Sequence, residues 1–184
     1  MTDAQLMNPR DVEIDTNGNL FIADTGNNRV LCWDKDGHPL RTLGINRVQD
    51  GRNWLQAGSG EGEYDEPQGI TVDDAGNIYV ADSNNHRIQK LDATGKLLLV
   101  FGEEGDNAGQ FLYPNDLRLG MDGGVYVFDL NGKRIQKFDP DGHFAFEVLL
   151  PEDAGSVGDF EVKPDGQILV ALRNSNMVLA LEIV

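Results

Sequence analysis

Cysteine, histidine and basic residues are scarce in this chain of 184 residues. Cys32 stands alone, which excludes a disulfide framework within one chain and favours a packed thiol. No apolar run approaches membrane-spanning length, and the opening residues MTDAQL are too polar for a signal peptide. We therefore expect no direct membrane insertion and a cytoplasmic protein, although an exported protein trimmed of its leader would have the same sequence.

Positive charge is outnumbered by negative charge. Lys and Arg total 15 against 31 Asp and Glu, which gives a formal net charge of −16 and a pI near 4.3. The resulting field repels phosphate backbones and anionic membrane surfaces, so we expect no nucleic-acid partner. An alternative interpretation is that the acidity serves only solubility.

Repetition is the most informative feature that the chain does have. The stretch 67–102 reads PQGITVDDAGNIYVADSNNHRIQKLDATGKLLLVFG, and 9–44 matches it closely. A third copy occupies 114–150, and a weaker fourth occupies 157–184. Starts at residues 9, 67, 114 and 157 give a period of roughly 43 to 58 residues, which indicates propeller blades rather than helical hairpins.

Each copy divides into short strands separated by turns. The second copy shows the expected strands at 69–73, 78–82, 87–92 and 97–102. Gly76 and Gly95 supply positive φ at the first and third turns, so the strands form antiparallel hairpins. The second strand is apolar at consecutive positions (IYVA in this copy), so both of its faces must be buried, as in sheets that stack around an axis.

These motifs resemble the NHL-repeat family of β-propellers, whose blade combines Pro-x-Gly-Ile, a Gly-Asn turn, Tyr-Val-Ala-Asp, Asn-Asn-x-Arg and a final Phe-Gly. The second copy carries the pattern at Pro67, Gly69, Gly76-Asn77, Tyr79-Val80-Ala81-Asp82, Asn85, Arg87 and Phe101-Gly102. The resemblance implies an all-β fold of four-stranded antiparallel blades, forming a single domain over residues 1–184. It says little about activity, because propellers host many unrelated functions.

The ends of the chain depart from the family pattern. The fourth copy stops after a third strand and lacks an outer one, whereas the family usually has about six blades. We therefore expect an open or incomplete propeller that assembles with another protein, with another copy of itself, or within a longer chain, unless four blades close unaided. The apolar faces expected to lack a neighbour carry Ile14, Phe21, Ile22, Val170, Leu179 and Leu181, beside an open strand edge at 177–184.

An aspartate ends the second strand of three copies, and an arginine begins the third strand five residues later. The pairs are Asp24 with Arg29, Asp82 with Arg87, and Asp129 with Arg134. In the fourth copy Leu172 and Met177 replace both members together. This joint loss predicts a structural pair in which the carboxylate braces the Asn-rich loop and receives the guanidinium, and it argues against catalysis.

The residue that opens the innermost strand is aspartate in three copies, at Asp11, Asp116 and Asp159, and glycine at Gly69. In a propeller these positions converge on the channel mouth, where facing carboxylates repel unless a cation such as calcium lies between them. The simpler alternative is that each aspartate is solvated or caps its own turn. We expect any ligand or partner contact there to use Arg10, Asp11, Gln68, Asn115, Asp116 and Asp159.

The segment 45–57 is an insertion, and it carries Arg47, Arg52 and Trp54 on an otherwise acidic body. Arginine beside an aromatic residue is typical of a contact hot spot, although the tryptophan could equally fold back onto the first blade.

The function that fits these observations is a non-catalytic protein-binding or scaffolding module. The alternative is part of a metal-dependent propeller hydrolase or lyase, since some related propellers hold zinc or calcium on their axis. His38, His86 and His143 lie in peripheral turns, so we assign no catalytic residue, metal ligand or cofactor.

Overall fold

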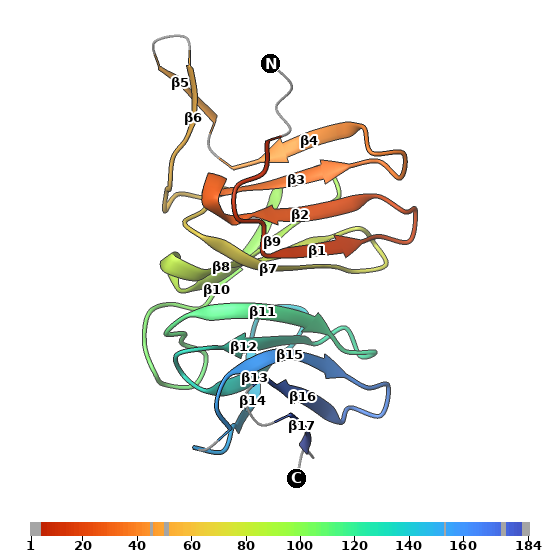
Figure 1. Ribbon diagram of the computed structural model, residues 1–184, viewed down its shortest axis with the longest axis vertical. Coiled ribbons are helices and arrows are strands. Elements are labelled where there is room, and N and C mark those ends of the chain that lie inside the picture. Colours follow the sequence, from red (N-terminus) through yellow and green to blue (C-terminus); the bar gives the residue numbers. More distant parts are fainter. Residues whose placement is uncertain (1–4, 45, 50–51, 153, 174–175, 182–184) are drawn as a thin grey trace.

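The computed structural model describes residues 5–44, 46–49, 52–152, 154–173 and 176–181, and only the backbone of 46–49 and 52–55. Four antiparallel sheets follow one another along the chain, each one a blade (Figure 1). Blade one comprises β1 (Asp11–Ile14), β2 (Leu20–Asp24), β3 (Arg29–Trp33) and β4 (Pro39–Leu43). Blade two comprises β7 (Pro67–Val72), β8 (Ile78–Asp82), β9 (Arg87–Leu91) and β10 (Leu97–Phe101).

Blade three comprises β11 (Pro114–Leu119), β12 (Val125–Asp129), β13 (Arg134–Phe138) and β14 (Phe144–Leu149). Blade four has three strands, β15 (Val157–Val162), β16 (Ile168–Leu172) and β17 (Met177–Leu181). The prediction of an all-β propeller with four blades, the last lacking its outer strand, is thus confirmed. No helix in the described part of the chain is long and apolar enough to cross a membrane.

The second strand of each inner blade is buried on both faces, as its consecutive apolar residues predict. All five residues of β8 and all five of β12 are buried. Three apolar clusters join blade one to blade two, blade two to blade three, and blade three to blade four. Among the described residues no such cluster joins blade four to blade one, and these two blades lie at opposite ends of the longest axis (Figure 1).

The apolar residues expected to lack a neighbour are mostly covered, and this part of the prediction is wrong. Phe21 packs against blade two and Val170 against blade three, because alternate residues of a strand face opposite ways. Ile22 is 6% exposed, and Leu179 and Leu181 are partly buried against blade three. Ile14 alone of the six is open, at 61% exposed.

Hydroxyl groups that follow the second strand of blades one and two hydrogen-bond to the innermost strand of the next blade. Thr25 donates to the carbonyl of Pro67 at 2.5 Å, and Ser83 donates to the carbonyl of Pro114 at 2.5 Å. Leu130 stands at the corresponding position of blade three and has no hydroxyl to offer. Blade four is therefore attached through its apolar cluster without this hydrogen bond.

The insertion forms a separate hairpin of β5 (Asn46–Gln49) and β6 (Arg52–Leu55), which projects beside blade one (Figure 1). Its register places Arg47 opposite Trp54 and Gln49 opposite Arg52. The side chains of Arg47, Arg52 and Trp54 lie outside the described part of the structure, so their role as a contact surface stays a prediction.

Tyr64, in the connector before blade two, is 0% exposed, and its hydroxyl has no hydrogen-bond partner among the residues that the structure describes. Burying an unpaired hydroxyl costs about 1 to 3 kcal/mol, whereas the phenyl ring packs in the core between blades one and two. We expect Tyr64→Phe to raise the free energy of unfolding by about 1 kcal/mol, measured by urea denaturation. A loss of stability would show that the hydroxyl binds a partner such as buried water.

Candidate functional site

The three predicted Asp–Arg pairs are present and buried. The Nε to Oδ2 distance is 2.6 Å for Arg29 and Asp24, 2.8 Å for Arg87 and Asp82, and 3.4 Å for Arg134 and Asp129. All three aspartate side chains are 0% exposed. The carboxylates also accept from the Asn-rich loop, as from Asn27 to Asp24 at 2.8 Å. The structure thus places each pair in contact as expected, while its role in stabilising the blade stays a prediction.

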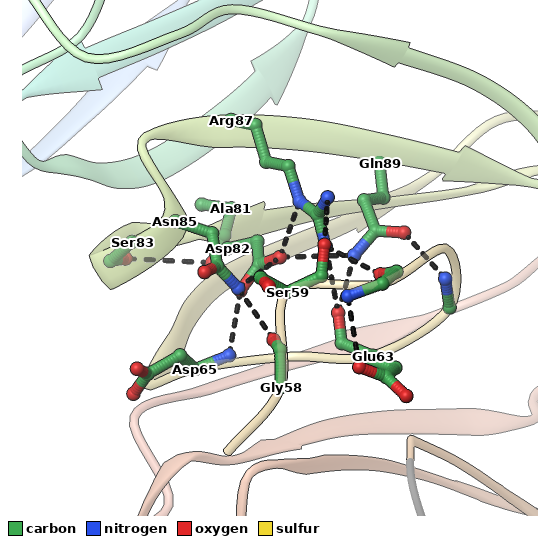
Figure 2. Close-up of polar contacts among 12 residues, drawn as sticks. Gly58, Ser59, Glu63, Asp65, Ala81, Asp82, Ser83, Asn85, Arg87 and Gln89 are labelled. Carbon is green, nitrogen blue, oxygen red and sulfur yellow. Dashed lines mark hydrogen bonds and ion pairs between the residues drawn. The ribbon is translucent and has the colours of Figure 1, made fainter.

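The pairs also hold the connector that leads into each blade, which the sequence reasoning missed. Asp82 accepts the backbone N–H of Asp65 at 2.8 Å, and Arg87 donates to the carbonyls of Ser59 and Gly60 at 2.8 and 2.7 Å (Figure 2). Gln89 adds a bond to Asp82 at 3.0 Å and another to the carbonyl of Glu63 at 2.7 Å. Each pair therefore fixes the connector that leads into the innermost strand of its blade.

A polar cavity of about 230 Å³, the axial cavity, lies where the innermost strands of the four blades meet. All six residues predicted for the channel mouth line it, and two arginines that the sequence reasoning missed complete it. The lining residues are Arg10, Asp11, Gln68, Asn115, Asp116, Arg118, Asp159 and Arg173. The structure therefore brings the predicted set together, while its use as a binding site stays a prediction.

Each channel-mouth aspartate hydrogen-bonds to the backbone of its own strand. Its Oδ1 accepts the backbone N–H of the following residue, at 2.8 Å for Asp11, 2.7 Å for Asp116 and 2.8 Å for Asp159. The second oxygen of Asp11 reaches the next blade and accepts the N–H of Ile70 at 2.9 Å. Gly69 cannot supply a carboxylate there, and Asp11 performs this role in its place.

Arg118 is the cation between the facing carboxylates. Its guanidinium donates to Asp116 at 2.7 Å and to Asp159 at 2.6 Å, and its Nε lies 3.7 Å from Glu161. Burial alone would lower the pKa of Arg118, but the surrounding carboxylates raise it. The arginine therefore stays charged and neutralises the acidic cavity.

No group of three or more His, Cys, Asp or Glu side chains among the described residues is placed to hold a metal ion. His38 and His143 are exposed and lie 3.1 and 3.0 Å from Asp34 and Asp139 of their own turns. His86 shares a hydrogen bond with the carbonyl of Leu112 at 3.0 Å. The histidines thus lie in blade turns and do not line the axial cavity.

Calcium is the cation that the sequence suggested for the channel mouth. Because Arg118 already pairs with Asp116 and Asp159, we expect added Ca²⁺ to leave the Tm of the chain unchanged. Arg118→Met removes the competing charge, and we expect this variant to gain a Ca²⁺-dependent rise in Tm. Calorimetric binding of Ca²⁺ by the unaltered chain would contradict the first expectation.

Asp116 gives the cavity a specific pH dependence. Burial raises its pKa to about 7, and the charges of Asp11 and Asp159 add to this, while Arg118 opposes it. Since an unfolded aspartate has a pKa of about 3.9, the folded chain holds a proton that the unfolded chain releases in this range. The contribution of Asp116 to stability therefore falls as pH rises from about 4 to 7.

We expect Asp116→Asn to remove that loss. Relative to the unaltered chain, the variant should gain at least about 1.4 kcal/mol of unfolding free energy between pH 4 and 8, the equivalent of one pKa unit. Urea denaturation of both proteins at each pH measures the difference and cancels the other titrating groups. Parallel pH profiles would show that Asp116 is ionised across the whole range.

Comparison with known proteins agrees with this geometry. A model of the NHL repeat matches residues 6–33 and 64–91. NHL repeat-containing protein 2 of Gallus gallus is 39% identical over 90 residues, which cover 47% of this chain and 11% of that protein. NHL repeat-containing protein 3 of Homo sapiens is 34% identical over 112 residues, which cover 56% of this chain and 29% of that protein.

Solved structures share the fold at low identity. A streptogramin B lyase superimposes with a TM-score of 0.67 at 20% identity, over 100% of this chain and 56% of that chain. Hydrazine synthase of Kuenenia stuttgartiensis gives 0.67 at 15% identity, over 99% and 49%. The chain thus spans about half of these structures and under a third of the curated relatives, so their activities do not carry over. The matched repeats and the blade architecture identify the chain as an NHL-repeat protein with the β-propeller fold.

Proposed function

We propose that this chain is a non-catalytic protein-binding module whose contact surfaces are the outer faces of its first and fourth blades. The outer face of blade one comprises Val12, Ile14, Leu20 and Ile22, of which Ile22 is itself covered at 6% exposed. The outer face of blade four comprises Leu169, Ala171, Val178 and Ala180. Both surfaces are defined by register, since each faces away from the apolar cluster that its blade shares with its neighbour.

The observation that carries the proposal is the exposure of these faces. Val12 and Ile14 are 54% and 61% exposed, and Val178 is 66% exposed. Blade two buries the corresponding residues, Ile70 toward blade one and Ile88 toward blade three, both 0% exposed. Apolar sheet faces that remain open on a folded protein are typical of interaction surfaces.

Site-specific photo-crosslinking tests this function. A benzophenone amino acid placed at Ile14 or Val178 is expected to crosslink to protein, and one placed at Met121, an 83% exposed residue of a blade-three turn, is not. Mass spectrometry identifies the crosslinked chain. Equal yields at all three positions, or none, would overturn the assignment of the outer faces as the contact surfaces.

An enzymatic alternative is favoured by one observation, the axial cavity of about 230 Å³ in a fold shared with a streptogramin B lyase. The histidines of this chain lie away from that cavity, which weakens the alternative. Incubation with streptogramin B and added divalent metal, followed by mass spectrometry, distinguishes the two functions. Conversion of the compound would favour the enzyme.

A further inference from the structure

Neighbouring blades pack through two different faces. In blade two, Ile70 and Val80 belong to the cluster shared with blade one, and Tyr79 and Ile88 belong to the cluster shared with blade three. Blade three repeats this division, with Val127 toward blade two and Tyr126 toward blade four. Each blade therefore has a leading face toward the preceding blade and a trailing face toward the next.

The outer face of blade one is a leading face that no blade of the described structure covers. The repeat alignment places Val12 and Ile14 at the positions of Ile70 and Val72. Val12 and Ile14 pair with Ile22 and Leu20 on β2, just as Ile70 and Val72 pair with residues of β8. Ile70 is 0% exposed where blade one covers it, whereas Val12 is 54% exposed.

The outer face of blade four is a trailing face that no blade of the described structure covers. Leu169, Ala171 and Val178 occupy the positions of Tyr79, Ala81 and Ile88. Those three residues of blade two are buried under blade three, at 2%, 0% and 0% exposed. In blade four Val178 is 66% exposed, and Leu169 and Ala171 are half-buried.

We propose that the partner of these two faces is a second copy of this chain, bound head to tail so that blade four of each copy packs on blade one of the other. The inference rests on the proposed protein-binding function and names its partner. A second copy carries both complementary faces, and the contact repeats the packing that already joins blades one, two and three. Two such contacts related by a twofold axis close a ring.

The number of blades fits a ring of two copies. The chain superimposes along its whole length on a lyase chain of which it covers 56%, so two copies exceed that chain and form a wider ring. Such a ring has eight blades, which lies within the about four to eight blades of known propellers.

Negative charge on both copies opposes this contact. Each copy carries a net charge of −16, and Asp159 and Glu161 at the inner edge of blade four would approach Asp11 of the other copy. Arg10 and Arg173 line the same cavity and offset part of this repulsion. Because salt screens repulsion between exposed charges, we expect association to strengthen from low to moderate ionic strength.

Sedimentation and light scattering over a concentration series test the inference. The unaltered chain is expected to reach twice its mass of 20.2 kDa, and more readily at about 0.5 M than at about 0.05 M salt. Ile14→Asp and Val178→Asp should each be monomeric, while Met121→Asp, altered outside both faces, should still dimerise. Far-UV circular dichroism and thermal melting establish that each variant is folded.

Mixing the two monomeric variants provides the decisive measurement. Blade four of the Ile14→Asp copy and blade one of the Val178→Asp copy are both unaltered, so a head-to-tail contact restores a mixed dimer. A contact between like faces would leave one of the two single variants dimeric on its own, and this result, like a mixture that stays monomeric, overturns the inference. A monomeric unaltered chain, or a continuous series of larger oligomers, also overturns it, and crosslinks from Ile14 and Val178 to a different protein would then leave the binding function standing.

Discussion

Replacing Asp82 with alanine is expected to lower the free energy of unfolding by about 3 kcal/mol. The carboxylate is 0% exposed and pairs with Arg87 at 2.8 Å. It also accepts from the N–H of Asp65 and from the side chains of Asn85 and Gln89. The substitution leaves a nearly buried guanidinium and several donors without their acceptor, which is more damaging than losing the attraction alone. Urea denaturation followed by circular dichroism measures the change.

Asp36→Ala provides the matched control. Asp36 forms an ion pair with Lys35 at 3.1 Å, but these side chains are 61% and 67% exposed, so the expected loss is under about 1 kcal/mol. The double variant Asp82→Ala with Arg87→Ala should be less destabilised than the sum of the two single changes, because neither charge is then left unpaired. Equal losses for Asp82→Ala and Asp36→Ala would contradict the structural role of the buried pair.

The Asp–Arg pairs were predictable from the sequence because blade four lost both members at once, as Leu172 and Met177. The contact of these pairs with the connector before each blade was not predictable. The connector before each blade has no residue that signals contact with the carboxylate, since it contributes backbone groups such as the N–H of Asp65. Gln89 and Gln136, each two residues after the arginine, were the available signal, and blade one lacks it at Leu31.

The axial cavity shows a similar division. Repeat alignment places an aspartate at the same position of three of the four innermost strands, so the convergence of Asp11, Asp116 and Asp159 could be predicted. Arg118 was missed because the position two residues after the opening residue varies among the copies, as Glu13, Thr71, Arg118 and Glu161. Alternation along β11 puts Arg118 on the same face as Asp116, and that spacing would have identified it.

The residues assigned from sequence to the outer faces of the terminal blades came from both faces of each blade, for a physical reason. Period-two alternation separates Phe21 from Ile22, but it does not say which of them meets the next blade. That choice depends on the direction in which successive blades stack, which is fixed by packing between blades. The structure resolves it, because Phe21 joins the cluster with blade two while Val12 and Ile14 face outward.

Gly69 is where the geometry of the axis leaves no room for a side chain. A Cβ at this position would lie 2.8 Å from the Cα of Asp116 and 2.9 Å from the carbonyl oxygen of Asn115, both backbone atoms of blade three. We therefore expect Gly69→Ala to lower the free energy of unfolding by about 2 kcal/mol, since β7 and β11 must separate. Gly69→Asp introduces the residue found in the other three blades, yet we expect it to be less stable than Gly69→Ala. Urea denaturation of each variant measures the difference.

Gly158 supplies the control for this prediction, because it lies beside the same axis on β15 and has ordinary backbone angles like those of Gly69. Its added Cβ would meet the Cγ of Arg173 at 3.0 Å, which belongs to a flexible and exposed side chain that can move. Gly158→Ala should therefore change stability by under about 1 kcal/mol, and the restricted unfolded chain favours a small gain. An equally small change for Gly69→Ala would mean that β7 and β11 move apart at little cost. The close approach of these two strands would then not explain why blade two has glycine in place of aspartate.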